Sequence, residues 1–300
     1  MCLAPFFIQE ESIALIIGEE KFTYKEIYRD IQMLNISLPY KSIVGLIGDY
    51  SYQFITTFFA LIKNKCTIVP ILPKNLDFDL EQFGIDYLYF TDSKELKQCD
   101  IQSQKNQILK QLKKENKSGL ILFSSGSTGI PKAIVHDLDS ILNLHCNKKH
   151  NPTKTLSIYL PDHIAGIDVL LSVFGTGGSL IIPKSRNPKD ILEAIQNNNA
   201  EILPTSPTML RLLLMHNIEN YNLTSLKLII YGSEKMKPNL LESLKKALPF
   251  VRFKQSFGTS ETNAIKTKNH DTKEEYFKIL DCDYKIKNNE LYLKSKTQSL

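Results

Sequence analysis

The residues best suited to chemistry in this sequence form one short run, Ser-Ser-Gly-Ser-Thr-Gly-Ile-Pro-Lys at positions 124–132. Glycines let backbone N–H groups approach an anion closely, and Ser and Thr hydroxyls add further donors. Lys132 adds a positive charge. The run is not a Walker A loop, because Gly126 and Gly129 are only three positions apart and a proline precedes the lysine. These residues indicate a phosphate-binding loop, and an ordinary Ser/Gly surface turn is the alternative.

The elements that must position this loop alternate between short apolar strands and amphipathic helices. Strands are predicted at 43–48, 67–71, 85–90, 119–123, 156–159, 179–182, 200–203 and 226–231. Helices are predicted at 52–63, from Asn187-Pro188 onward, at 207–216 and at 238–248. This alternation predicts an α/β fold with parallel sheets covered by helices, which bind ligands at the carboxyl ends of strands. The phosphate-loop candidate follows such a strand end.

Composition and charge place few restrictions on function. The chain has 300 residues, of which 42% are hydrophobic and 23% charged, as in an ordinary globular protein. The mild net charge of +5 suits binding of anions such as ATP, CoA or an acidic carrier protein. The sequence has no basic patch of the kind that would indicate binding of nucleic acid. Five scattered cysteines without a C-x-x-C pair predict a reducing cytoplasm, and no run is long enough for a membrane span. His145, Cys146 and His150 are expected in a solvated loop rather than at a metal.

The run at 124–132 resembles the phosphate loop of the adenylate-forming, or AMP-binding, enzymes. This superfamily includes acyl-CoA synthetases, peptide-synthetase adenylation domains and luciferases. Its loop reads Ser/Thr-Ser/Thr-Gly-Ser/Thr-Thr-Gly-x-Pro-Lys, and every position matches here. The resemblance implies that this loop holds the phosphates of ATP, through Ser124, Ser125, Gly126, Ser127, Thr128, Gly129 and Lys132.

A second block, Phe257-Gly258-Thr259-Ser260-Glu261, resembles the aromatic-Gly-x-Thr-Glu motif of the same family. The resemblance implies that Phe257 lies against adenine, that the Ser260 hydroxyl meets the α-phosphate and that Glu261 binds Mg²⁺. Gly258 and Thr259 belong to the same nucleotide contact. A phenylalanine in place of the usual tyrosine keeps the stacking surface but loses a hydroxyl. A single glutamate suits Mg²⁺, which takes one or two carboxylates plus phosphate oxygens.

Two further blocks resemble the family less specifically. His163, in Leu-Pro-Asp-His-Ile-Ala-Gly at 160–166, resembles a histidine that borders the acyl pocket of acyl-CoA synthetases. It favours acyl and aryl acids over amino-acid activation, although a histidine satisfied within the core or a loop is the alternative. Gly232, Ser233 and Glu234 resemble a turn that contacts adenine and the acyl group, and a plain strand-to-helix turn is the alternative.

The resemblance implies two α/β lobes in an αβαβα layered arrangement. Residues 1–265 would form the large domain, with its lobes joined around 100–118, and 266–300 would begin a small β subdomain. The family's next motif, Tyr-x-Thr-Gly-Asp, and the following lid domain have no match, so we expect the C-terminal lid to be absent.

The implied reaction is attack of a carboxylate on the α-phosphorus of ATP, followed by transfer of the acyl group to the thiol of CoA or a phosphopantetheine carrier. Mg²⁺ and Lys132 would offset the repulsion between the two anions. Three hypotheses follow: an AMP-forming acid–thiol ligase that works with a lid on another chain, an enzyme that adenylates slowly alone, or a non-catalytic nucleotide- or acyl-binding interaction protein. The expected partners are a small carboxylic acid and a carrier protein or lid-bearing chain. The acid itself is not identified.

Overall fold

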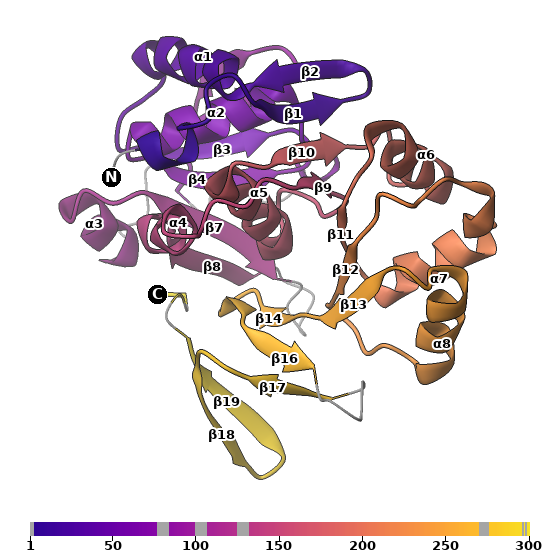
Figure 1. Cartoon of the computed structure of the whole chain (residues 1–300). Coiled ribbons are helices and arrows are strands. Elements are labelled where there is room, and N and C mark those ends of the chain that lie inside the picture. Colours follow the sequence, from indigo (N-terminus) through magenta and orange to yellow (C-terminus); the bar gives the residue numbers. More distant parts are fainter. Residues whose placement is uncertain are drawn as a thin grey trace.

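The computed structural model describes residues 3–76, 84–99, 107–124, 132–269, 276–295, 297 and 299–300. Within them, strands and helices alternate around two mainly parallel sheets, and small antiparallel pairs follow at the C-terminal end (Figure 1). The predicted α/β fold class is confirmed. In the same residues, no helix is both long enough and apolar enough to cross a membrane.

The described strands between residues 43 and 137 form one sheet of six strands, in the order β6-β5-β3-β4-β7-β8. β3 pairs in parallel with β4 and β5, β4 pairs with β7, and the edge strands β6 and β8 are antiparallel. The strands are β3 (Ile43–Ile47), β4 (Thr67–Ile71), β5 (Tyr87–Phe90), β6 (Glu95–Gln98), β7 (Gly119–Ser124) and β8 (Lys132–Asp137). The helices of this half are α1 (Tyr24–Ser37), α2 (Tyr52–Lys63), α3 (Gln107–Lys114) and α4 (Leu138–Cys146).

A second sheet of seven described strands has the order β13-β12-β11-β9-β10-β1-β2. Its members are β1 (Ile13–Ile17), β2 (Glu20–Thr23), β9 (Lys154–Leu156), β10 (Ser179–Ile182), β11 (Ile202–Thr205), β12 (Leu228–Tyr231) and β13 (Arg252–Gln255). Its helices are α5 (Ile164–Thr176), α6 (Pro188–Asn198), α7 (Pro207–Met215) and α8 (Pro238–Ala247). β1 pairs in parallel with β10, with Leu15 opposite Leu180. The N-terminal hairpin, which the sequence did not predict, therefore completes a sheet otherwise built from the second half of the chain.

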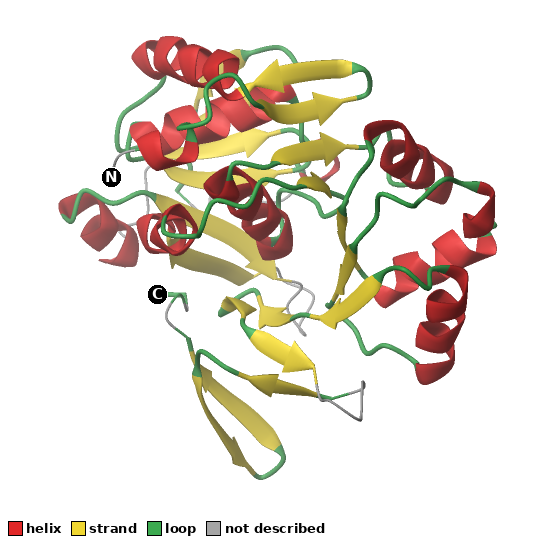
Figure 2. Ribbon diagram, viewed as in Figure 1, coloured by secondary structure: helices red, strands yellow, loops and turns green. Residues whose placement is uncertain are grey.

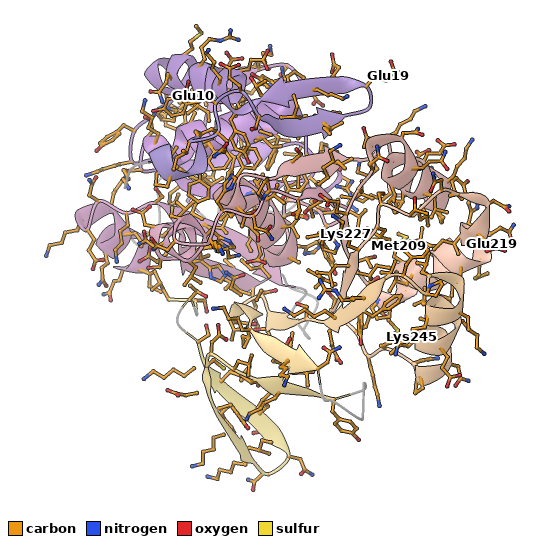
Figure 3. All side chains as sticks on the ribbon, in the orientation of Figure 1. Glu10, Glu19, Met209, Glu219, Lys227 and Lys245 are labelled. Atoms are coloured by element: carbon orange, nitrogen blue, oxygen red, sulfur yellow. The ribbon has the colours of Figure 1, made fainter. Side chains whose placement is uncertain are left out.

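Helices α2 and α5 lie in the layer between the two sheets (Figure 2). Nine consecutive residues of α2, from Phe54 to Ile62, are buried, and a helix that is buried all round must pack on every side. Leu112 of α3 packs on the other face of the six-stranded sheet. Helices α6, α7 and α8 cover the outer face of the seven-stranded sheet, where Met209 packs, while Glu219 lies at the outer edge of the molecule (Figure 3). These layers give the αβαβα order that the family resemblance implied.

The C-terminal residues form three antiparallel strand pairs. They are β14 (Phe257–Thr259) with β15 (Asn263–Ile265), β16 (Thr267–Asn269) with β17 (Phe277–Ile279), and β18 (Asp283–Lys287) with β19 (Glu290–Lys294). Residues 290–294, whose apolar side chains alternate with polar ones in the sequence, form β19. The proposed division at residue 265 and the lobe junction around 100–118 stay predictions.

The first turn of α7 is capped by two separate side chains. The Ser206 hydroxyl accepts from the Met209 backbone N–H, as an N-cap serine should. Glu234, which follows β12, accepts from the Thr208 backbone N–H (3.1 Å) and from the Thr208 hydroxyl (2.8 Å). A carboxylate is favourable there because the first helical N–H groups lack partners within the helix.

Glu234→Gln should lower the free energy of unfolding by about 0.5 kcal/mol at neutral pH, a small value because the side chain is exposed and screened by water. Burial acts to raise the pKa of Glu234, but hydrogen bonds from Thr208 and Ser206 outweigh it, and the pKa lies below its ordinary value of 4.5. The stabilisation should therefore be present above pH 4.5 and disappear as the pH falls through the folded-state pKa. Urea unfolding of both proteins at neutral and acidic pH measures this, and a difference that persisted at low pH would contradict it.

Gly166 allows α5 to approach the preceding segment closely. A Cβ at this position would lie only 2.1 Å from the Leu160 carbonyl oxygen, a backbone atom that cannot move aside cheaply. Gly18 offers a matched contrast, because its φ is +60° but no described atom lies within 4 Å of a Cβ built there.

Gly166→Ala should destabilise the protein by about 2 kcal/mol or more through this overlap, whereas Gly18→Ala should cost only about 1 kcal/mol for its left-handed backbone. Urea unfolding of the two variants measures the difference. Equal losses of stability in both would show that the contact with Leu160 is relieved at little cost.

Candidate active site

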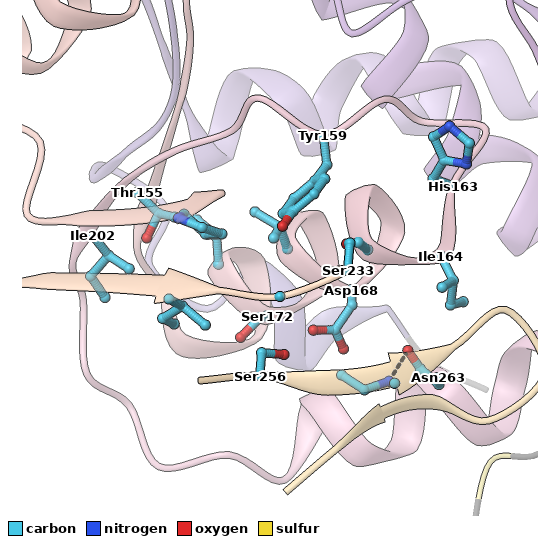
Figure 4. Close-up of a pocket in the computed structure, with 18 of the residues that line it drawn as sticks. Thr155, Tyr159, His163, Ile164, Asp168, Ser172, Ile202, Ser233, Ser256 and Asn263 are labelled. Atoms are coloured by element: carbon cyan, nitrogen blue, oxygen red, sulfur yellow. Dashed lines mark hydrogen bonds between the residues drawn. The ribbon is translucent and has the colours of Figure 1, made fainter. Parts of the chain in front are cut away.

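A cavity of about 720 Å³ lies between α5, strand β11, the end of β12 and the β14–β15 hairpin. Its lining includes the carboxyl ends of β11 and β12, and open α/β sheets bind ligands at the carboxyl ends of their parallel strands. Tyr159, His163 and Ser233 line it on one side, and Ser256 and Asn263 line it on the other (Figure 4). The cavity thus joins segments from four separate parts of the chain.

The predicted turn after β12 reaches the cavity through Gly232 and Ser233. Ser233 adopts a left-handed backbone with φ of 71°, which turns the chain sharply after the strand. A Cβ on Gly232 would lie 3.0 Å from the Ser256 carbonyl oxygen. The glycine therefore lets this turn approach the segment that leads into the second motif.

The second motif lines the cavity with Phe257, Gly258, Thr259 and Ser260. The Thr259 and Thr262 hydroxyls each accept a hydrogen bond from the other residue's backbone N–H, at 3.1 and 3.2 Å. These bonds hold the tight turn of the β14–β15 hairpin, whose tip carries Ser260 and the exposed Glu261. On the strand itself, the Phe257 ring lies 5.2 Å from the Phe277 ring, centroid to centroid.

Strand β8, which begins with Lys132, passes close to the hairpin tip at His136. His136 of β8 is only 1% exposed; burial lowers its pKa, while the Ser260 backbone and the Glu261 charge act in the opposite direction. Glu261 therefore lies near β8, and Ser299 and Leu300 bridge the two by donating backbone hydrogen bonds to the carbonyls of Glu261 and Val135. Lys132 and His136 lie on the same face of β8, roughly 13 Å apart.

The phosphate-loop candidate is described only at its two ends. Ser124 ends β7 and pairs with Lys132, the exposed first residue of β8. The remaining predicted phosphate ligands lie outside the described residues, namely Ser125, Gly126, Ser127, Thr128 and Gly129. The β7–β8 pair thus holds both ends of the loop together at one end of the six-stranded sheet.

His163 occupies the N-cap position of α5 and lines the cavity (Figure 4). Its side chain is 60% exposed and forms no capping hydrogen bond, and its Nε2 lies 3.8 Å from Asp162 Oδ1. Burial raises the pKa of Asp162 and the neighbouring His163 counteracts this. The alternative of a histidine satisfied within the core does not fit this exposure.

Glu234 has a different position from its neighbours in the turn. Its carboxylate contacts Thr208 at the start of α7, whereas Gly232 and Ser233 line the cavity. The contact of Glu234 with a nucleotide or acid stays a prediction.

The residues present suit a metal only in combination with phosphate. Among the described residues, no group of three or more His, Cys, Asp or Glu side chains could hold an ion. Glu261 supplies one carboxylate, and Mg²⁺ needs only one or two when phosphate oxygens complete its octahedron. The donor set therefore fits Mg²⁺ delivered with a nucleotide, held by Glu261.

Sequence reasoning missed the wall that α5 forms along the cavity. Asp168, Ser172 and Thr176 recur at intervals of four, which places them on one helical face, and all three line the cavity. That spacing was visible in the sequence, but α5 itself was not predicted. The expected solvated loop was wrong for His145, which lies in the last turn of α4 and is only 2% exposed, whereas His150 is exposed beyond the end of that helix.

Comparison with known proteins identifies the family. A model of the AMP-binding enzyme family matches residues 81–298. A putative long chain fatty acid–CoA ligase, VraA, of Staphylococcus haemolyticus is 26% identical over 86% of this chain and 58% of its own length. The 4-coumarate–CoA ligase 4 of Arabidopsis thaliana is 25% identical over 48% of this chain and 27% of its own length. The chain thus spans less than two thirds of the length of each of these relatives.

Solved structures share the fold at low identity. The N-terminal subdomain of Klebsiella oxytoca NpsA, solved with 3-hydroxyanthranilyl-AMSN, has a TM-score of 0.77 and 18% identity, covering 99% of this chain and 86% of that one. The anthranilate CoA ligase AuaEII, solved with anthranoyl-AMP, has a TM-score of 0.78 and 16% identity, covering 98% and 67%. Since the family model spans most of the chain and the fold agrees, this protein belongs to the AMP-binding enzyme family.

Proposed function

We propose that this chain activates a carboxylic acid with ATP to form an acyl-adenylate. The observation that carries the proposal is that one cavity is bordered by both predicted nucleotide segments, Gly232–Ser233 and Phe257–Ser260. Glu261 adjoins it at the hairpin tip, and β8, which begins with Lys132, passes close to Glu261. Family membership supports the same reaction class.

The chain's residues act mainly by positioning and by charge. A carboxylate oxygen attacks the α-phosphorus of ATP, the bond from that phosphorus to the bridging oxygen breaks, and pyrophosphate leaves. Both reactants are anions, so Lys132 would reduce their repulsion and bind the leaving phosphates. The Ser260 hydroxyl would donate to the α-phosphate, and Phe257 would present its ring face to adenine. Mg²⁺ held by Glu261 would neutralise phosphate charge when bound.

The second half-reaction would transfer the acyl group to the thiol of CoA or of a phosphopantetheine carrier. The named CoA ligases among the relatives support an acid–thiol ligase. His163, at the cavity wall, would border the acyl group. A partner chain carrying a lid and a cytoplasmic location both remain predictions from the sequence.

Glu261→Ala and Lys132→Ala should each weaken binding of ATP with Mg²⁺ by about tenfold or more, because each removes a charge that pairs with phosphate or its metal. Calorimetric titration measures the affinity. Glu261→Ala should also abolish the benefit of added Mg²⁺, whereas Lys132→Ala should leave it.

Lys189→Ala and Glu193→Ala on α6 provide matched controls. These residues form an exposed i, i+4 pair with Nζ 3.7 Å from Oε1, away from the cavity lining. Both controls should bind ATP like the original protein. If neither Lys132→Ala nor Glu261→Ala changed the affinity for ATP, the proposal of adenylation at this site would be wrong. Tight ATP binding without acid-dependent release of pyrophosphate would instead identify a nucleotide-binding protein that does not catalyse the reaction.

A further inference from the structure

The cavity has a polar end that the adenylation reaction does not explain. We name Asp168, Ser172 and Thr176 the α5 wall; all three line the cavity, as do Asn151, Thr153 and Thr155. Most of the other residues of α5 are apolar and pack into the core between the sheets. A site for a purely hydrocarbon tail has no use for these polar groups, since burying them unpaired costs free energy.

Asp168 is the charged member of this wall, and its carboxylate points into the cavity on the side that faces Ser256 (Figure 4). The residue lies deep in the protein, yet 27% of its side-chain surface stays exposed, as expected for a group that faces a cavity. Its position is set by the approach of two helices, because a Cβ on Gly175 would lie 2.6 Å from the His145 carbonyl oxygen.

The surroundings keep this carboxylate ionised. His145 is 2% exposed, and its Nε2 lies 3.2 Å from Asp168 Oδ1. Burial acts to raise the pKa of Asp168, but the contact with His145 and the charge of Lys148 outweigh it, so the pKa lies below its ordinary value. At neutral pH the cavity therefore contains a carboxylate anion.

The other polar groups of the wall are already engaged with protein. The Thr176 hydroxyl donates to the Ser172 backbone carbonyl (2.9 Å), and the Ser172 hydroxyl accepts from Lys148 Nζ (3.0 Å). Among the described residues, the contact with His145 is the one polar partner of the Asp168 carboxylate. A carboxylate offers about four acceptor sites, so most of its capacity faces the cavity unused.

We propose that Asp168 selects the acid substrate, by accepting a hydrogen bond from an amino or hydroxyl group on the part of the acid remote from its reacting carboxylate. This rests on the proposed function in taking the ligand to be a carboxylic acid. An acid with a plain hydrocarbon tail would remove water from Asp168 without replacing its hydrogen bonds, which is unfavourable.

Matched acids that differ in one group test this on the unaltered protein. Benzoates and short aliphatic acids carrying an amino, a hydroxyl or a methyl group at the same position are titrated calorimetrically, without nucleotide. The best amino- or hydroxyl-bearing acid should bind about tenfold or more tightly than its methyl analogue. Equal affinities throughout both series, or no binding by any acid, would overturn the inference.

The variant Asp168→Asn distinguishes acids with an amino group from acids with a hydroxyl group, because it removes the charge of the side chain and keeps one acceptor oxygen. The variant should lower the affinity for an acid with a protonated amino group more than for an acid with a hydroxyl group. Its affinity for the acid with a methyl group should be unchanged. Thr176→Val, which alters a wall residue whose hydroxyl is bound to its own helix, should preserve the preference. If Asp168→Asn weakened all three acids equally, Asp168 would serve only to join α4 to α5, and the inference would fail.

Acid-dependent exchange of pyrophosphate into ATP distinguishes this inference from the proposed function. Exchange with methyl acids as readily as with amino or hydroxyl acids would leave adenylation standing and refute the role of Asp168. Selective binding of the donor-bearing acids without any exchange would support Asp168 and count against adenylation.

Discussion

The close packing of α5 against neighbouring backbone is the constraint on which the rest of the structure depends. Two of its glycines permit it, because Cβ atoms at Gly166 and Gly175 would overlap the carbonyl oxygens of Leu160 and His145. Just after the helix, Gly178 allows the chain to approach the Thr153 carbonyl oxygen in the same way. With these approaches, one face of α5 fills the core between the sheets and the other lines the cavity. The packing that stabilises the fold therefore also sets the shape of the site, and a change in one alters the other.

Charge is distributed unevenly around the cavity. At the hairpin tip, Glu261 is exposed and lies near His136 of β8, as suits a nucleotide that arrives with its own phosphates and metal. At the α5 wall, Asp168 is enclosed and already held by His145. A group that is fixed in place before a ligand arrives needs little reorganisation when the ligand binds. The end of the cavity at the α5 wall is therefore suited to selecting the acid, and the end at the hairpin tip to the reaction with the nucleotide.

The local elements were predictable where one residue type restricts the backbone. Helices α6, α7 and α8 all begin with proline at the first position, as the sequence indicated, because the fixed φ of proline suits a helix start and its missing N–H is not needed there. Strands rich in β-branched residues, such as β4 and β10, were also predicted at their observed bounds. Helix α5 was missed because it is apolar on most sides and gives little periodic signal.

The sequence by itself determined the α/β class, the family resemblance and the short motifs that would contact a nucleotide, because each depends on residues close together in the chain. Only the tertiary structure decided that Gly232–Ser233 and Phe257–Ser260 border one cavity, and that β1 pairs with β10. It alone also brought Asp168 against His145, at the end of a different helix. The physical reason is that these contacts follow from packing between distant segments, which depends on the shapes of all the partners at once and leaves no local pattern in the chain.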